Sequence, residues 1–301
     1  LWAQTYEFGS AEFFDVQEHI ATRIVGTWLP KLRENELQRI RLKRPDTMTA
    51  YDLVAEARDN IFQLTPDAFA SAEILLNRAL ELDARYPQSR TMMAELLNLR
   101  VGQGWSTDVL GDAASVDDMT RSALTSDPFN VRALAIYGHN RSFLHRDYET
   151  ATKLFERALG IAPNDATALM WSAKTAAYVG DGPTAVSQAE RALKLSPRDS
   201  FLFRHYTGLC LAHYANGDFG EAVHWGLLGM REAPLYTANL RFTAAAMVEI
   251  GRIDDAREVV RQVHALQPSY GVRTVLDRHP FEDRGRRERI ARALATAGLP
   301  D

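Results

Sequence analysis

One pattern of apolar, small and turn-forming residues recurs along most of this chain. A helical stretch is followed by a Gly-Asp or similar turn, a second helical stretch that carries Ala and a bulky residue, and then a Pro. The closing positions of successive units lie 44, 35, 34, 37 and 34 residues apart: Ala84, Pro128, Pro163, Pro197, Pro234 and Pro268. The pattern predicts pairs of helices repeated along the chain.

The positions inside each unit indicate which repeat this is. Small or bulky residues stand 12, 8 and 5 residues before the closing position, as Ala151, Phe155 and Ala158 do before Pro163. Small side chains let the second helix lie close to the first, and the bulky residue fills the groove between them. Helix pairs with a period of about 34 residues are typical of the tetratricopeptide repeat, or TPR. The predicted fold class is therefore all-α, a TPR superhelix (α-solenoid) of five to six helix pairs over residues 47–268.

Glycine and proline mark the predicted turns. Gly180, Gly217 and Gly251 each lie 17 residues before the closing Pro of their unit, where the first helix must end. Glycine readily adopts the left-handed conformation that commonly ends a helix. We expect the closing Pro to begin the next helix, where no backbone N–H is required. The unit ending at Pro128 carries about ten extra residues, and these predict a long turn at 101–112 that contains Trp105.

The two ends of the chain differ from the repeats. Residues 1–46 are expected to hold a remnant strand and an amphipathic N-terminal linker helix, whose interleaved basic and acidic residues predict a solvated face. Residues 269–301 are expected to form a C-terminal cap. Its helix has Ile290, Leu294 and Ala297 as the buried stripe and Gly298 after the last turn. Five arginines, at 284, 286, 287, 289 and 292, are expected to keep the outer face of the cap soluble.

Composition and motifs limit the chemistry. Thirty-five Lys and Arg against 39 Asp and Glu give a net charge of −4, so neither nucleic acid nor an anionic membrane is expected as a partner. No apolar run spans a membrane and no signal peptide precedes the first helix, which favours a cytoplasmic protein. Cys210 is the only cysteine and is expected in the core. The three histidines of the fifth unit, His205, His213 and His224, are expected between helices rather than on a metal. We find no catalytic motif and expect no enzyme activity, cofactor or metal in this chain.

Several segments resemble one family of bacterial signalling proteins. They are the opening LWAQTYEF with FFDVQEHIATRIV, the loop GWSTD (104–108), FERALGIAPNDATAL (155–169) and the ending HPFEDRG…LATAGLPD. In that family a TolB-like α/β domain ends in such a strand, and a helix and a TPR array follow. The N-terminal partner is commonly a class III adenylate or guanylate cyclase domain, and in other members a winged-helix DNA-binding domain. The resemblance implies a regulatory TPR part that controls an attached effector.

The first helices of a TPR array line its concave face, so inward positions can be predicted. Counting 4, 7, 11 and 14 residues from each closing position selects Gln88, Thr91, Glu95, Asn98, Arg132, His139, Thr167, Met170, Lys174, Phe201, Arg204 and Arg241, with Tyr178 one position beyond. We expect a basic ladder of Arg132, Lys174, Arg204 and Arg241 to bind an acidic peptide or a C-terminal carboxylate.

Four alternatives stay open. The basic side chains of the ladder can instead pair with acids on neighbouring helices and cover apolar surface. The chain can also be a small-molecule receptor, or the ligand-sensing half of a winged-helix transcriptional regulator. Finally it can be a homodimerisation module, with Phe13, Phe14 and Trp28 as interface anchors.

Overall fold

The computed structural model describes residues 32, 34–40, 42–43, 47–199 and 201–301. The predicted strand at the start of the chain and the aromatic residues Phe13, Phe14 and Trp28 lie outside these residues. Within the first 46 residues, residues 34–40 are helical. No strand occurs among the described residues.

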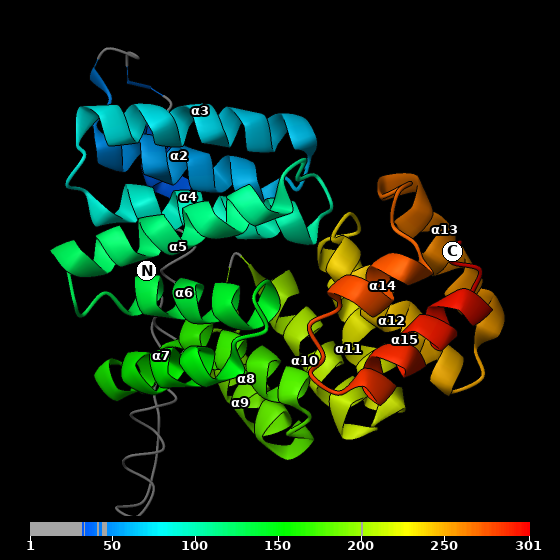
Figure 1. The fold of residues 1–301 in the computed structure, drawn as a ribbon. Coiled ribbons are helices and arrows are strands. Elements are labelled where there is room, and N and C mark those ends of the chain that lie inside the picture. The colour runs from blue at the N-terminus through cyan, green and yellow to red at the C-terminus, as the bar shows by residue number, and fades with distance from the viewer. Residues whose placement is uncertain (1–31, 33, 41, 44–46, 200) are drawn as a thin grey trace, which may run out of the picture.

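Six pairs of antiparallel helices form a TPR superhelix, as the repeat pattern predicts (Figure 1). The first helices of the pairs are α2 (Ala50–Phe62), α4 (Pro87–Gly102), α6 (Val131–Phe143), α8 (Ala166–Val179), α10 (Leu202–Asn216) and α12 (Thr237–Glu249). The second helices are α3 (Pro66–Leu82), α5 (Val109–Ser126), α7 (Tyr148–Ile161), α9 (Gly182–Leu195), α11 (Phe219–Glu232) and α13 (Ile253–Leu266). Two further helices, α14 (Val272–Arg278) and α15 (Arg284–Thr296), follow the array.

The prediction that the closing Pro begins the next helix is wrong. The helices begin three to five residues later, at Val131, Ala166, Leu202 and Thr237. An Asn or Asp stands between the Pro and two of these helices, and its side chain accepts a hydrogen bond from the third backbone N–H of the helix, as Asn130 and Asp165 do. The capping side chain therefore sets the start, and the Pro lies in the preceding turn. At the other end of the first helices, Gly180, Gly217 and Gly251 have φ angles of 90°, 89° and 81°, as expected for left-handed glycines.

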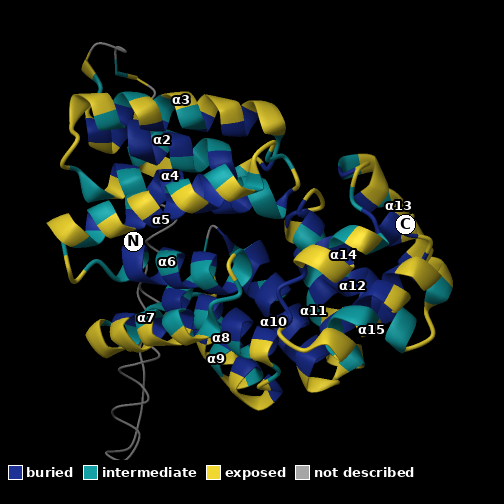
Figure 2. Ribbon diagram, viewed as in Figure 1, coloured by how far each residue is buried: buried dark blue, intermediate teal, exposed yellow. Residues whose placement is uncertain are grey.

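The repeat positions form the core between the helices. Ala151, Phe155 and Ala158 of α7 are buried, and the alanines at the same positions of α9 are fully buried. Figure 2 shows the buried residues where helices meet and exposed residues along the outer faces of α3, α5 and α7. In α11, Gly226 and Gly229 take the second and third of these positions. A Cβ at Gly226 would lie 2.2 Å from Thr243 Oγ1, so α11 and α12 approach more closely than two alanine-bearing helices would.

The superhelix closes on itself through the turn after α4. Only residues 103–108 of the predicted long turn are non-helical, because α4 runs to Gly102 and α5 begins at Val109. Gln103, fully buried, donates through Nε2 to the Leu235 carbonyl (2.9 Å) and accepts from the Thr237 backbone N–H (3.0 Å). Arg241 donates to the Gly102 carbonyl (3.1 Å). A TPR unit normally contacts only its neighbours, whereas here the second unit also contacts the start of the sixth.

The C-terminal segment docks inside the array as well as against its end. Helix α15 packs on α12, with Ile290, Leu294 and Ala297 buried as predicted. The linker before α15 reaches the middle repeats, where the Tyr148 hydroxyl donates to the Pro280 carbonyl (2.6 Å). The Phe281 ring, 1% exposed, lies against Tyr178 and Tyr214.

The sequence predicts only that the arginines of the C-terminal cap keep its outer face soluble. The structure corrects this, because several of them form specific hydrogen bonds. Arg286 donates to the Ala215 carbonyl (2.9 Å), and Arg287 donates to the Phe281 carbonyl (2.7 Å). Arg289 forms two hydrogen bonds of 2.7 Å with the Glu249 carboxylate. Arg286 and Arg289 therefore hold the cap to the array, and Arg287 braces the linker inside the cap. Arg284 and Arg292 pair only with Glu288 of their own helix among the described residues.

Candidate functional site

A cluster of charged side chains lies in the interior of the superhelix, contributed by the first helices of several units. Glu95 of α4 is 1% exposed and forms ion pairs with Arg132 of α6 and Arg204 of α10. Burial raises the pKa of Glu95, but the charges and hydrogen bonds of the two arginines outweigh this and lower it to about 2. One carboxylate thus holds two guanidinium groups that come from units far apart in the sequence.

Lys174 of α8 lies near this cluster and lacks a counter-ion. Its side chain is buried, with 5% of the residue exposed, and it forms no ion pair or hydrogen bond with any described residue. Burial, together with the positive charge of Arg204, lowers the pKa of the ammonium group to about 7. An amine in this state accepts a proton readily when a negative group approaches it.

Arg204 presents one unused edge of its guanidinium group. Its Cζ atom lies 3.8 Å from the centroid of the Phe201 ring, so the planar group stacks on the aromatic ring. Nη1 donates to Glu95, while Nε and Nη2 are buried and have no hydrogen-bond partner among the described residues. Nε and Nη2 lie along the same edge of the planar guanidinium group. Together they form the fork that binds a carboxylate or phosphate through two parallel hydrogen bonds.

An aromatic stack borders these cations. The His139 ring of α6 lies parallel to the rings of Phe143 (5.3 Å between centroids) and Trp171 (5.4 Å). Burial and the charges of Lys174 and Arg204 lower the pKa of His139 well below its ordinary value, so the imidazole is neutral near pH 7. Its Nδ1 atom is buried and has no hydrogen-bond partner within the described part of the chain.

Two further charged groups act on the cluster from its edge. Arg58 of α2 has its pKa lowered by burial and by the positive charge of Arg132. Asp199 lies 3.4 Å from His205 Nε2 and accepts a hydrogen bond from the Phe201 backbone N–H (2.8 Å), so its pKa is about 2 despite burial. Asp165 also acts on Arg132, so four cationic side chains, from Arg58, Arg132, Lys174 and Arg204, face the three carboxylates of Glu95, Asp165 and Asp199.

The structure divides the predicted basic ladder into two parts. Arg132, His139, Lys174, Phe201 and Arg204 come together around Glu95. Arg241 instead belongs to the closure of the superhelix, where it donates to the Gly102 carbonyl (3.1 Å) and Gln267 Oε1 (3.0 Å) and lies over the Tyr270 ring.

Two of the predicted groove residues serve packing. Met170 lies in the core, where a Cβ added to Gly208 would come within 2.0 Å of its sulfur. Tyr178 packs on Phe281, and its carbonyl accepts a hydrogen bond from the Glu282 N–H (2.9 Å). The sequence reasoning placed Glu95 on the inner face, and its alternative that the basic side chains pair with acids on other helices holds for Arg132 and Arg204. It missed Arg58, Trp171 and Asp199.

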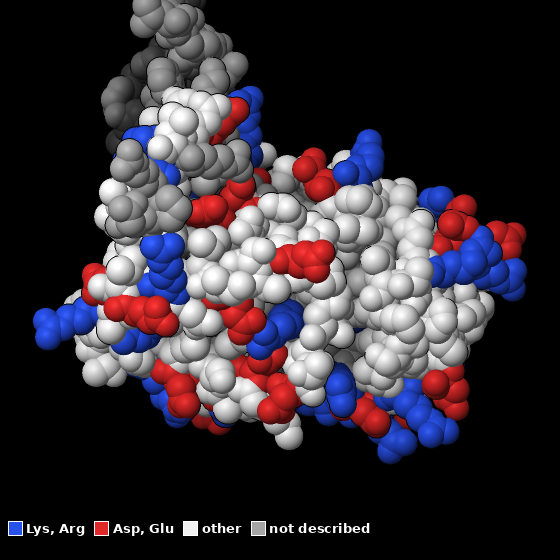
Figure 3. All heavy atoms as spheres, turned by 90° about the horizontal axis from the view of Figure 1, so that it is seen from above, with Lys and Arg blue, Asp and Glu red and all other residues white. Residues whose placement is uncertain are grey.

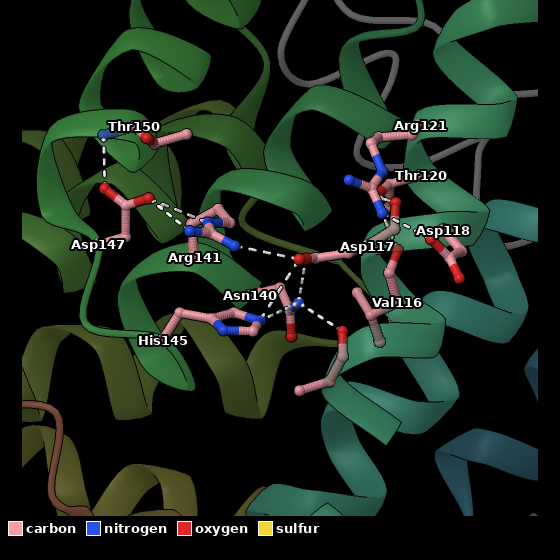
Figure 4. Close-up of polar contacts among 11 residues, drawn as sticks. Val116, Asp117, Asp118, Thr120, Arg121, Asn140, Arg141, His145, Asp147 and Thr150 are labelled. Carbon is pink, nitrogen blue, oxygen red and sulfur yellow. Dashed lines mark hydrogen bonds and ion pairs between the residues drawn. The ribbon is translucent and has the colours of Figure 1, made fainter. Parts of the chain in front are cut away.

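A second polar cluster, around Asp117, shows a different balance of charge (Figure 4). Asp117 of α5 accepts hydrogen bonds from Asn140 Nδ2 (2.6 Å) and Arg141 Nη1 (3.1 Å) of α6. Arg141 also donates to Asp147 at 2.5 Å, and Asp147 caps α7 through the Thr150 N–H. Every charged group here has an opposite partner, so this cluster fixes the arrangement of α5, α6 and α7. The unpaired donors around Glu95 are what set the interior cluster apart.

The remaining candidates of the sequence are structural. Cys210 is fully buried, and burial raises the pKa of its thiol to about 12, so it lies in the core as predicted. His213 lies 3.4 Å from Asp218 and His224 packs on the Trp225 ring. Among the described residues no group of His, Cys, Asp and Glu is placed to hold a metal ion. None of the described helices is long and apolar enough to cross a membrane. On the face shown in Figure 3, acidic and basic side chains are interspersed around a broad uncharged area.

Comparison with known proteins supports the fold and gives one weak link to function. No family model matches the sequence. Over 83 residues, 28% of this chain, the sequence is 32% identical to the protein described as putative adenylate cyclase 3 of Rhizobium meliloti (strain 1021), and this match covers 14% of that relative.

Among solved structures, the chain resembles the Cut9–Hcn1 hetero-tetramer of APC/C. The TM-score is 0.60 at 11% identity, and the match covers 94% of this chain and 49% of that one. A thermophilic TPR protein from Thermus thermophilus gives a TM-score of 0.49 at 15% identity, over 64% of this chain and 97% of that protein. The helix pairs of the structure and the likeness at a TM-score of 0.60 make the chain a TPR superhelix.

Proposed function

We propose that this chain is a non-catalytic regulatory TPR module that binds an anionic group in the interior of its superhelix. In the protein that carries it, this binding controls an effector such as a nucleotide cyclase. The observation that carries the proposal is a pair of cations beside Glu95. Arg204 has buried Nε and Nη2 atoms without a hydrogen-bond partner among the described residues, and Lys174, 5% exposed, forms no ion pair among them.

The physical argument starts from the cost of burying charge. A buried cation without a counter-ion is destabilising, because burial removes its hydration and supplies nothing in return. Replacing Lys174 by an apolar residue would therefore stabilise the empty protein. A charged side chain that costs stability and forms no ion pair among the described residues is typical of a binding site rather than of a structural core.

The proposed effector rests on sequence. The 83-residue similarity to a putative adenylate cyclase supports a link to second-messenger synthesis. The resemblance of the opening, the GWSTD loop and the ending to TolB-like signalling proteins supports the same class of partner. In this proposal the TPR array is the regulatory part of such a protein, and the signal passes from the interior cluster to a domain attached to the array.

The experiment compares the natural protein that contains this chain with its Lys174→Met variant. Lys153→Met is the matched control, because Lys153 lies on the outer face of α7 and pairs only with Glu149 of its own helix among the described residues. We expect the effector output, measured as cyclic nucleotide formed in a cyclase-deficient strain, to change in Lys174→Met and not in Lys153→Met. Equal output from the wild-type protein and both variants would contradict the proposal.

A further inference from the structure

We infer that the interior cluster is a binding site for a small oxyanion, a carboxylate or phosphate group on a molecule of low molecular weight, held by Arg204, Lys174 and Arg132. This inference rests on the proposed function and narrows it from any anionic group to a compact ligand.

The first part of the site is the free edge of Arg204. Stacking on Phe201 and the ion pair with Glu95 fix the plane of the guanidinium group, so the Nε and Nη2 donors have a set direction. Both atoms are buried and lack a partner among the described residues. Two oxygens of one carboxylate or phosphate match the spacing of these two donors.

The second part is the charge that surrounds this edge. Lys174 supplies an ammonium group without a counter-ion, and its charge and that of Arg204 both act on His139. Glu95 carries a single negative charge and already pairs with Arg132 and Arg204, so it does not neutralise Lys174 as well. A ligand that carries one or two negative charges would complete the balance of the cluster.

The third part is access and shape. The Arg132 side chain is 37% exposed, so solvent reaches the cluster from that side. The rings of His139 and Trp171 lie on the helices that carry Arg132 and Lys174, and they offer a flat apolar surface to the carbon part of a ligand.

The closure of the superhelix argues for a small ligand rather than an extended peptide. The Glu95–Arg204 ion pair and the Phe62–Phe201 ring contact (3.9 Å) cross the interior beside the cluster. Gln103 joins the turn after α4 to Thr237, and Phe281 covers Tyr178 farther along. A peptide running along the concave face would have to break these contacts, whereas a compact anion would not.

The test uses the full 301-residue chain and measures its melting temperature with inorganic phosphate, succinate, citrate or an eight-residue Asp/Glu peptide. Each is compared with sodium chloride at the same ionic strength. We expect inorganic phosphate and at least one carboxylate to raise the wild-type melting temperature by ~5 °C at concentrations well above Kd. Lys153→Met should respond in the same way. Lys174→Met should melt at or above the temperature of the empty wild-type protein and lose the response.

Four results would overturn the inference. If no small anion raises the melting temperature above the chloride control, no small-anion site exists. If Lys174→Met keeps the full response, the anions bind elsewhere. If only the acidic peptide stabilises the protein, and does so through Lys174, the proposed function survives and the small-ligand inference falls. If neither peptide nor small anion binds, both fall together.

Discussion

Glu95 on α4 and Arg204 on α10 form a buried ion pair, although 109 residues separate them in the sequence. In a simple solenoid, units so far apart do not touch. Here the superhelix turns far enough for the second and fifth units to meet across its interior. The same carboxylate binds Arg132 of the third unit through Nε at 3.2 Å. Glu95 is therefore the point at which three units are joined electrostatically.

Removing the charge of Glu95 should be strongly destabilising. Glu95→Gln leaves the buried guanidinium of Arg204 and the partly exposed one of Arg132 without their carboxylate, which costs about 3–5 kcal/mol. Urea unfolding followed by circular dichroism measures this loss. Glu149→Gln, an exposed carboxylate paired with Lys153, should unfold like the wild type. If the two variants had the same unfolding midpoint, the interior ion pairs would not contribute as the structure indicates.

The pKa of Glu95 adds a pH dependence with a defined sign. Its pKa is about 2 in the folded protein against 4.5 ordinarily, so folding favours the ionised form. The stability that this provides is fully present above pH 4.5 and is lost as the pH falls toward 2. Glu95→Gln should lack this contribution to the loss of stability in acid. Measuring the free energy of unfolding of both proteins as the pH is lowered would show the difference.

Replacing Lys174 should stabilise the empty protein. The pKa of Lys174 is about 7 when folded and 10.5 ordinarily, so between these values the unfolded chain binds a proton that the folded chain does not. The unfolding free energy of the wild type should therefore rise as the pH increases from 7 to 10.5. Below pH 7 the cost of burying the ammonium group is fully present. Lys174→Met should lack this rise and exceed the wild-type stability at pH 6. A less stable variant at pH 6 would show that Lys174 has a structural role.

The turn after α4 should act as a clasp between the second and sixth units. Gln103→Ala leaves the Thr237 N–H and the Leu235 carbonyl without their buried partner, at a cost of about 3 kcal/mol. Hydrogen exchange at the Thr237 amide should become faster than in the wild type. Gln88→Ala is the control, because Gln88 is exposed at the start of α4. It should change neither the stability nor the exchange rate of the Thr237 amide. Unchanged exchange at Thr237 in Gln103→Ala would mean that the clasp is not formed.

Phe281 should anchor the C-terminal segment inside the array. Phe281→Ala empties the space between Tyr178 and Tyr214 and should cost about 3–5 kcal/mol. The Glu282 amide, which donates to the Tyr178 carbonyl, should then exchange quickly. Phe129→Ala is the control because Phe129 is 72% exposed. Similar stability of the two variants would show that the segment does not dock there.

The repeat itself was predictable because it rests on local rules. Ala and bulky residues at fixed offsets pack one helix pair, and glycine at positive φ ends a first helix, as at Gly180 and Gly217. Each rule involves residues within a single unit. The helix starts were misplaced for a similar local reason, since Asn130 and Asp165 cap their helices after the Pro rather than at it.

The site was predictable only in part because charge pairing depends on the curvature of the whole array. The inward positions of Arg132, Lys174 and Arg204 followed from helix geometry. Whether they meet Glu95 depends on how far the four units from the second to the fifth rotate relative to one another, and small angles between successive units add up. No pattern in the sequence indicates that Arg241 leaves the cluster to join the Gly102 carbonyl.

The most direct test of the central claim is the pKa of Lys174, measured by NMR from the pH dependence of its side-chain Nζ and Cε signals. Comparison with Lys174→Met assigns these signals. We predict a value of about 7 in the empty protein, because the ammonium group is buried beside Arg204, and a clear increase when inorganic phosphate binds. A value near 10.5 in the empty protein would show that Lys174 is solvated or already paired, and it would contradict the interior anion site.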